Sequence, residues 1–516
     1  MTVAKLLSDL EQLNVDLWLE AGQLRFRAPS GAMSEDVRKK LSRHRAEIVR
    51  IYQEATRLAA GSSTQFSDED LPLTPHQAWY VSTFDPERHD WAMTVALDAP
   101  WPVSDEVLRA TLRELAQEHD VFRVRLYRTP AGSWAQRLLP RSEEIPVAVH
   151  DLPGLEPTAR HRAIHAAGYR AQQSLNSLSG PVVALAVCRW GEGEPDKIIF
   201  SLHHYTVDKY SLNLFIGEFL RVYQRRIAAK QPGVRPTAAS YRDYVIGLYV
   251  YTHQLSVVAR SLAFWCDPVR VRRLPRLPVD MPNGRHTDVN SRRISIALDT
   301  SLRQKVVKYI RSQKGVVFND LLLFGLAQAF FRWTGERALR LDLEYQVRIG
   351  LLPRMDLLGT IGAATVKFPM LLNLDPDGGM EDVLEELRSS VRETVDNALG
   401  FGFLRYTCAD PEIRQRLNAC ASPQVFVNNR SALGASKAAE APRVAMKSMS
   451  FPQPGGRENP VSYDLMIECD GSEDRLVVTW VYSSAIHHEQ TIRTLSSDFF
   501  AALHALTSCN QFAAMS

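Results

Sequence analysis

Two adjacent histidines and a nearby aspartate are the residues of this sequence whose types and spacing could perform chemistry. His203 and His204 lie in the stretch SLHHYTVDKYS, and Asp208 follows four residues after the second histidine. An imidazole, with an ordinary pKa of about 6.5, can serve as a general base at neutral pH. A carboxylate in a tight loop can accept hydrogen bonds or pair with an arginine and so hold the shape of the loop. Spacing alone is a weak signal, because H-x-x-x-D patterns often arise by chance.

The histidine pair is expected where a buried strand ends and a helix begins. Residues 197–202, KIIFSL, predict a short apolar strand. Ser211 could then cap the following helix. The buried stripe of that helix would be Leu212, Phe215, Phe219 and Val222. Such strand ends often carry active-site groups. A second pair, His487 and His488 in IHHEQ, lacks an aspartate four residues on and is interpreted as the structural start of a surface helix.

Composition places the chain among ordinary globular proteins. It has 516 residues, 45% of them hydrophobic, and a formal net charge of only +3, so two or three domains and no nucleic-acid partner are expected. Six scattered cysteines without a CxxC pair argue against a zinc site or a disulfide framework. No signal peptide and no apolar run long enough for a membrane span is visible. We therefore expect a cytoplasmic protein that binds no metal and no membrane.

Residues 1–54 predict a small unit of two helices around a β-hairpin. The hairpin turns at Ala21-Gly22, and Ser34 can cap the second helix. Residues 23–50 hold eight basic side chains against three acidic ones. The simplest interpretation is a solvated helix face, but a basic groove beside a sheet edge could also accept an acidic extended peptide. The residues predicted to bind it are Leu24, Arg25, Phe26, Arg27, Lys39, Lys40 and Arg43.

The remainder predicts a linker and a larger α/β body. Residues 55–70 are small and polar, which is typical of a linker. From residue 71 onward, strand-like and helix-like segments alternate to the end of the chain. We expect two lobes, at residues 71–248 and 249–516.

At this point the sequence resembles the condensation domains of nonribosomal peptide synthetases. HHYTVD is similar to their HHxxxDG core, and LPLTPHQAWYV (71–81) to their opening S/TxxQ motif. QEHDVFRVRLY (117–127) is similar to RHExLRTxF, with Arg123 at the arginine position. SYRDYVIGL, LPVDMP and DLLGTIGAATVKFP continue the family's motifs in the same order. The resemblance covers about residues 71–510 and is specific when the motifs are taken together.

The resemblance implies an α/β (α+β) fold with two chloramphenicol-acetyltransferase-like lobes in a V-shaped pseudo-dimer. His204, beside His203, would take or orient the nucleophile's proton or stabilise the tetrahedral intermediate. Asp208 would be structural and paired with Arg123. Three positions depart from the family's pattern and are channel candidates: Lys209 replaces the motif glycine, and Ala363 and Ala364 stand where aromatic residues are usual.

The first 54 residues also resemble a β-hairpin docking domain, which binds a short acidic motif at the C-terminus of an upstream carrier-protein subunit. No adenylation or carrier domain is recognisable in the sequence. The resemblance therefore implies a monomeric acyltransferase acting in trans, similar to the chain-releasing condensation proteins of hybrid polyketide–peptide assembly lines (enacyloxin type). It would use phosphopantetheine on the partner carrier, without a bound cofactor of its own. The acyl chain would pass to a small amine or alcohol and leave as an amide or ester.

Three alternatives stay open from the sequence. A non-catalytic recruitment domain would keep the fold and lose the histidine's function, and Lys209 beside the loop favours this interpretation. An epimerase-like relative is the second alternative, because the segment around residues 356–369 is closer to that branch. A coenzyme-A-dependent acyltransferase of the wider HxxxD superfamily is the third, although no DFGWG segment is present.

Overall fold

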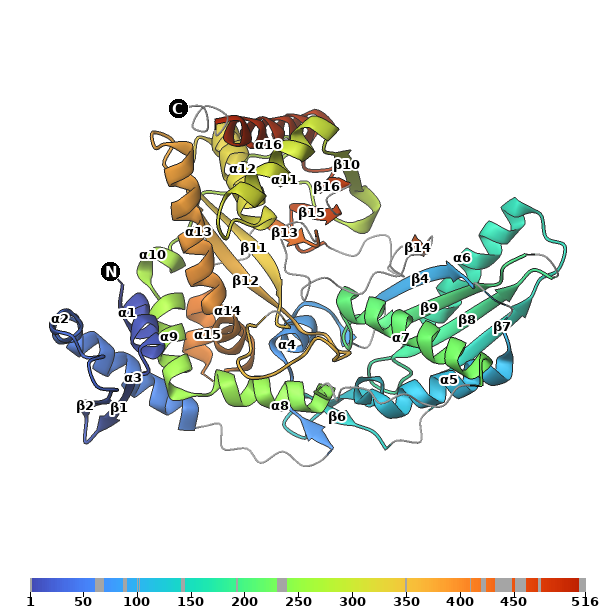
Figure 1. Ribbon diagram of the computed structural model, residues 1–516, viewed down its shortest axis with the longest axis horizontal. Coiled ribbons are helices and arrows are strands. Elements are labelled where there is room, and N and C mark those ends of the chain that lie inside the picture. The colour runs from blue at the N-terminus through green and yellow to red at the C-terminus, as the bar shows by residue number, and fades with distance from the viewer. Residues whose placement is uncertain are drawn as a thin grey trace.

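The computed structural model describes most of the chain in one body with two lobes and an N-terminal unit (Figure 1). The described residues are 2–60, 69–86, 91–99, 101, 103–140, 144–191, 194–229, 239–348, 350–408, 410–418, 424–431, 448–450, 461–471 and 475–509. Among them, no helix has both the length and the apolar character needed to cross a membrane.

The N-terminal unit contains three helices around a two-stranded hairpin. Its elements are α1 (Val3–Gln12), β1 (Asp16–Glu20), β2 (Gln23–Arg27), α2 (Glu35–Arg43) and α3 (Arg45–Ala60). The hairpin turns at Ala21 and Gly22, both with positive φ, as a two-residue turn between twisted strands requires. Ser34 caps α2 by accepting from the Val37 amide, as predicted. The expected single second helix is two helices, because α2 ends at Arg43 and His44 separates it from α3.

The predicted linker begins later than expected. Residues 55–60 continue α3, and Ala55 is fully buried. Residues 61–68 of that prediction lie outside the described part of the chain. Helices α1 and α3 pack against α9 (Leu255–Trp265) of the body. Ion pairs join Arg260 to Glu11 and Arg57 to Asp410 across this contact. The N-terminal unit is therefore packed onto the body.

A five-stranded sheet forms the core of the N-terminal lobe, in the order β14-β4-β9-β8-β7. Its strands are β4 (Ala92–Asp98), β7 (Val147–Asp151), β8 (Val183–Arg189), β9 (Lys197–His203) and β14 (Ser448–Ser450). Successive side chains of β9 point to opposite faces. Phe200 packs on Phe215 and Phe219 of α7, whereas Ile199 lies in the cluster that includes Ile164 of α6. The covering helices are α5 (Asp105–Glu118), α6 (Pro157–Gln173) and α7 (Lys209–Ile227).

A six-stranded sheet forms the core of the C-terminal lobe, in the order β10-β16-β15-β13-β11-β12. One face is covered by helices, where Trp480 meets Phe499, and the other face is polar, where Ser295 and Thr479 bond across two strands. Its strands are β10 (Ser291–Ala297), β11 (Ala338–Gln346), β12 (Thr365–Asn373), β13 (Val425–Asn429), β15 (Leu465–Gly471) and β16 (Leu476–Ser483). Its helices are α11 (Thr300–Ser312), α12 (Phe318–Thr334), α13 (Met380–Asp396) and α16 (Glu489–Cys509).

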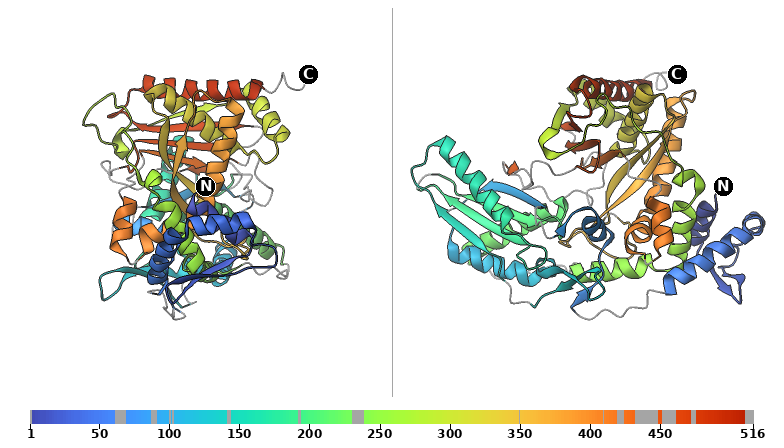
Figure 2. Two further views of the ribbon diagram at one scale, coloured as in Figure 1. Left: turned by 90° about the vertical axis from the view of Figure 1, so that its left-hand side faces the viewer. Right: turned by 180° about the vertical axis from the view of Figure 1, so that it is seen from behind.

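The lobes diverge from a common base, so the molecule is V-shaped (Figure 2). At the base, α4 (Pro75–Thr83) and α8 (Tyr241–Thr252) lie near the three-stranded sheet β3-β6-β5. Those strands are β3 (Asp70–Leu71), β5 (Val124–Arg128) and β6 (Trp134–Leu138). The remaining short elements are η2 (Asp120–Arg123), α10 (Pro268–Val271), η3 (Asp288–Asn290), α14 (Ala398–Gly402), η4 (Phe403–Thr407) and α15 (Pro411–Asn418).

The chain does not divide between the lobes at residue 248 as predicted. That boundary falls inside α8, which continues to Thr252. In addition, β14 comes from the second half of the chain but pairs antiparallel with β4 of the N-terminal lobe. A sequence pattern cannot reveal this exchange, because strand pairing between distant segments is decided by tertiary packing.

Candidate active site

His204 lies between the lobes, immediately after β9. Its backbone amide donates to the carbonyl of Trp91 at 2.9 Å, which continues the pairing of β9 with β4. Its ring stacks on the Trp91 indole, with 4.2 Å between centroids. Burial lowers the pKa of His204 below its usual value, and Glu344 opposes this effect. The imidazole is therefore neutral near pH 7 and able to accept a proton.

His203 holds the loop and is fully buried. Its Nδ1 accepts from the Tyr205 amide at 3.2 Å. Its carbonyl accepts from the amide and the hydroxyl of Thr206, each at 3.0 Å. His203 thus fixes the turn that presents His204, and the two predicted histidines have different surroundings.

Asp208 is buried at the start of α7 and is the centre of a polar hub (a buried carboxylate, an arginine and the backbone around them). It accepts from Arg348 at 2.6 Å and from the amides of Ser211 and Ala364 at 2.8 and 3.0 Å. Burial alone would raise the pKa of Asp208, but these donors bring it below its usual value. A buried carboxylate with three donors stays ionised, which supports the predicted structural role.

The predicted partner of Asp208 was wrong. Arg123 donates to the carbonyl of Leu139, whereas the guanidinium bonded to Asp208 belongs to Arg348, whose side chain is fully buried. Arg348 follows β11, in a segment that matches none of the recognised motifs. The pair is therefore an ion pair between lobes.

The predicted cap of α7 also needs correction. The helix begins at Lys209 and Asp208 is its cap, so Ser211 lies inside the first turn. The Ser211 hydroxyl instead joins the hub, where it accepts from Arg348 at 2.7 Å and lies 2.7 Å from the Gly362 carbonyl.

The two alanines of the segment at residues 360–364 face the loop with their backbone. The Ala363 amide donates to the Thr206 carbonyl at 2.7 Å, and the Ala364 amide donates to Asp208. Both alanines are fully or almost fully buried. A cavity of about 260 Å³ lies beside the site, and neither alanine is among the described residues that line it. Small side chains permit this close approach of two backbones, so the prediction that they widen a channel gains no support here.

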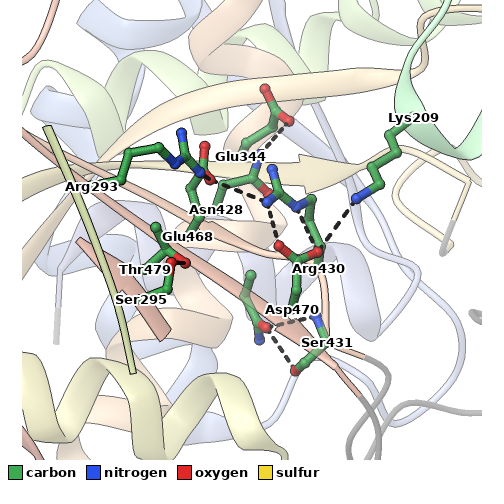
Figure 3. A network of polar contacts seen from close by, with 11 residues as sticks. Lys209, Arg293, Ser295, Glu344, Asn428, Arg430, Ser431, Glu468, Asp470 and Thr479 are labelled. Carbon is green, nitrogen blue, oxygen red and sulfur yellow. Dashed lines mark hydrogen bonds and ion pairs between the residues drawn. The ribbon is translucent and has the colours of Figure 1, made fainter. Parts of the chain in front are cut away.

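Lys209 points toward Asp470 and Arg430, along the polar face of the C-terminal sheet (Figure 3). Its ammonium lies 3.4 Å from Asp470 of β15, and its side chain is 57% exposed. Asp470 also pairs with Arg430, and Arg430 with Glu468. The lysine in place of the motif glycine therefore forms a surface ion pair between the lobes.

Sequence reasoning missed two further rings at the site, His76 and Trp91. His76, on α4, lies with its ring centroid 6.0 Å from that of His204, and its Nδ1 is 3.1 Å from the Thr365 hydroxyl. Burial, with His204 and Lys367 nearby, lowers the pKa of His76 to about 3. The TPHQ motif contained the signal, because Thr74 and Gln77 form a capping box that places His76 on the first turn of α4.

Of the predicted docking residues, Leu24, Arg25, Phe26 and Arg27 lie on β2, and Lys39, Lys40 and Arg43 lie on α2. The outer edge of β2 has no neighbouring strand in the described residues. Phe26 is 45% exposed, with the Arg38 guanidinium 5.9 Å from its ring. Arg27 and Arg43 are exposed, and Leu24 is half-buried. Three predicted cations already have acidic partners: Arg25 pairs with Glu20, Lys39 with Glu35 and Lys40 with Asp36. Arg38 is an addition to the predicted set.

A cluster of ligand-type atoms lies elsewhere in the N-terminal lobe. It consists of one carboxylate oxygen each from Glu118 and Glu218 and a ring nitrogen of His119, all within 4.8 Å of one another. His119 lies 2.6 Å from Glu218, which a hydrogen bond explains without an ion.

The chain belongs to the condensation-domain family, whose model matches residues 67–514. The TubC N-terminal docking domain matches residues 3–54. One of the linear gramicidin synthase proteins of Brevibacillus parabrevis is 27% identical over 445 residues, which is 86% of this chain and 6% of that protein. The chain spans less than a tenth of the length of the first three curated relatives.

Solved structures agree with this assignment. The epimerization domain from the third module of tyrocidine synthetase B superposes with a TM-score of 0.72 at 20% identity, covering 86% of this chain and 99% of that one. The condensation domain that mediates chain release from the enacyloxin polyketide synthase gives 0.64 at 17% identity, covering 98% and 96%. At these identities the likeness shows the fold alone. The predicted family, its two acetyltransferase-like lobes and its docking unit are confirmed.

Proposed function

We propose that this protein is a carrier-dependent acyltransferase that acts in trans and releases an acyl chain onto a small amine or alcohol. The observation that carries the proposal is the neutral imidazole of His204, held between the lobes next to the Asp208–Arg348 hub. Membership of the condensation-domain family supports acyl transfer in general, and a docking unit supports a carrier-protein partner.

In the proposed reaction, His204 takes the proton from the acceptor's hydroxyl or amine as its oxygen or nitrogen attacks the thioester carbonyl. The new C–O or C–N bond forms, the C–S bond breaks, and the proton passes to the departing phosphopantetheine thiolate. Asp208 and Arg348 position the loop and do not touch the reacting atoms. Phosphopantetheine would enter on the carrier as part of the substrate.

The docking unit would bind an acidic C-terminal tail of the carrier protein along the free edge of β2. An added strand gains main-chain hydrogen bonds, Phe26 supplies an apolar contact, and Arg27 and Arg43 supply charge. Lys39 should contribute less, because its ammonium lies 2.8 Å from Glu35.

Intact-protein mass spectrometry of an acyl-loaded carrier with an acidic tail tests the proposal. We expect unloading that requires an added amine or alcohol and is lost in His204→Ala. Combined Phe26→Ala and Arg27→Gln should slow unloading at low carrier concentration, and Lys39→Gln should slow it much less. Point substitutions are preferable to deletion of the docking unit, because its helices α1 and α3 pack on α9 and their removal would also disturb the body. A carrier that binds but is never unloaded would contradict the proposal and favour a recruitment domain.

A further inference from the structure

A cavity of about 260 Å³ lies beside the candidate site, on the polar face of the C-terminal sheet. Its walls come from several elements, and the residues that matter here are Trp79, Asp342, Lys367, Arg405, Tyr406 and Tyr463. Pockets for drug-sized molecules measure roughly 300–1,000 Å³, so this cavity suits a smaller molecule.

The cavity leads toward His204. A smaller void of about 10 Å³ is lined by His76 and shares Trp79, Lys367 and Tyr406 with the larger cavity. The ring of His76 in turn lies beside that of His204, with 6.0 Å between centroids. A molecule in the cavity would therefore have one end close to the ring that neighbours the proposed base.

Two charged groups in the cavity already have partners. The Lys367 ammonium lies 3.6 Å from the centre of the Trp79 ring and 3.8 Å from Glu344. Asp342 accepts from the Tyr463 hydroxyl at 2.7 Å, and burial raises the pKa of Asp342 to about 6. These internal pairs leave little net charge in this part of the wall.

Arg405 is different. Within the described part of the chain, its guanidinium makes no hydrogen bond or ion pair, and it faces the ring of Tyr406 at 4.8 Å. Its charge also acts on Asp342, where it opposes the rise in the pKa of that carboxyl that burial causes. It lies on η4, which is a π-helix. Such turns are rare and are frequently found at functional sites. A half-buried guanidinium with free donors matches the planar fork of a carboxylate.

We propose that this cavity binds the acceptor and that Arg405 selects acceptors carrying a carboxylate. The inference rests on the proposed function and adds the substrate class. The carboxylate of the acceptor pairs with Arg405, and the rings of Trp79 and Tyr406 pack on the rest of the acceptor. The nucleophilic amine or hydroxyl of the acceptor then points toward His76 and His204. A monoanion suits the site better than a dianionic phosphate, because the Asp342 carboxylate shares the same wall.

Calorimetric titration of the full chain with 3-hydroxybenzoate and its neutral counterpart 3-hydroxybenzamide tests the site. We expect the acid to bind about ten-fold or more tightly than the amide, the effect of one charged hydrogen-bonding contact. Arg405→Gln should abolish that preference, and Arg405→Lys should retain part of it. The matched control is Arg337→Gln, an exposed arginine at the far end of β11 that pairs with Asp377 and should leave the preference unchanged.

Equal binding of acid and amide, or a preference that survives in Arg405→Gln, would overturn the inference. Inorganic phosphate that binds as tightly as the acid and through Arg405 would also overturn it, and would assign the cavity to the carrier's phosphopantetheine arm. Binding should persist in His204→Ala, which separates the two proposals. Acid binding through Arg405 without carrier unloading would defeat the proposed function alone. Unloading that depends on His204 but not on Arg405 would defeat this inference alone.

Discussion

The loop that carries His204 has a counterpart in the other lobe. β9 is the second strand of the run β4-β9-β8-β7, and β16 is the second strand of the run β10-β16-β15-β13. In both runs the successive pairs are antiparallel, antiparallel and then parallel, and a long helix follows β9 and β16 in the chain. The His204 amide bonds the Trp91 carbonyl at 2.9 Å, and the Ser484 amide bonds the Asn290 carbonyl at 2.9 Å. Residues 201–210 and 481–490 thus have closely matching backbones.

Their side chains differ in every group the candidate chemistry needs. Ser483 and Ser484 replace the histidine pair, and exposed His488 takes the place of buried Asp208 at the helix start. His487 is buried, with its ring 5.7 Å from that of Trp333, which fits the predicted structural role although not a surface position. The comparison teaches that the fold supplies the loop, while a few side chains decide which copy can do chemistry.

The largest stability effect should come from the hub that only one loop has. Arg348→Met leaves Asp208 buried and unpaired, which should lower the free energy of unfolding by about 3–5 kcal/mol. His488→Ala, at the equivalent position of the other loop, should change it by less than about 0.5 kcal/mol. Urea titrations of both variants check this. Equal effects would mean that the two loops are held in the same way.

Because the folded-state pKa of Asp208 is lowered, the hub's contribution is complete above the unfolded pKa of about 3.9. It should be lost as the pH falls through the lower folded value. The difference in stability between wild type and Arg348→Met should accordingly shrink in acid. A difference that grows there would contradict the assignment of Asp208 as the ionised partner.

Protonation of His76 should make the free energy of unfolding depend on pH, with a smaller effect than the loss of the Asp208–Arg348 pair. Its pKa is lowered to about 3 when folded, so the unfolded chain binds the proton first and stability falls on acidification. Between pH 7 and 5 the loss from this residue should be about 2 kcal/mol. His76→Gln, which cannot titrate, should lose less stability than wild type over the same interval. If the free energy of unfolding fell equally with pH in both proteins, His76 would not be the group responsible.

The smallest effect should come from the surface contact beside the loop. Lys209→Gly removes an exposed ion pair to Asp470, so it should change the free energy of unfolding by less than about 1 kcal/mol. Carrier unloading should be unchanged, because the ammonium is directed to Asp470 (Figure 3). Activity that appears only after this substitution would instead identify Lys209 as the inactivating residue.

The sequence predicted what local patterns encode. The apolar run at 197–202 became β9, and the Ala21-Gly22 turn closed the hairpin. The order of the motifs indicated the condensation-domain family, and the first 54 residues indicated the docking domain. These features depend on residues near one another in the chain.

What the sequence did not predict depends on contacts across the fold. Arg348 reaches Asp208 from 140 residues away, and β14 joins a sheet built from the first half of the chain. Arg123 occupied the expected motif position, yet its guanidinium bonds a nearby carbonyl, because the space at Asp208 is filled from the other lobe. No periodicity in the sequence specifies such partners.

Comparing His204→Ala with Ser484→Ala in the carrier-unloading assay tests the central claim most directly. Removal of a general base typically costs roughly 10²–10⁴-fold in rate, so His204→Ala should lose nearly all acceptor-dependent unloading. Ser484→Ala, on the matching backbone of the other loop, should retain the wild-type rate. Unloading that persists in His204→Ala, or falls equally in both variants, would contradict the account that only the N-terminal loop performs the chemistry.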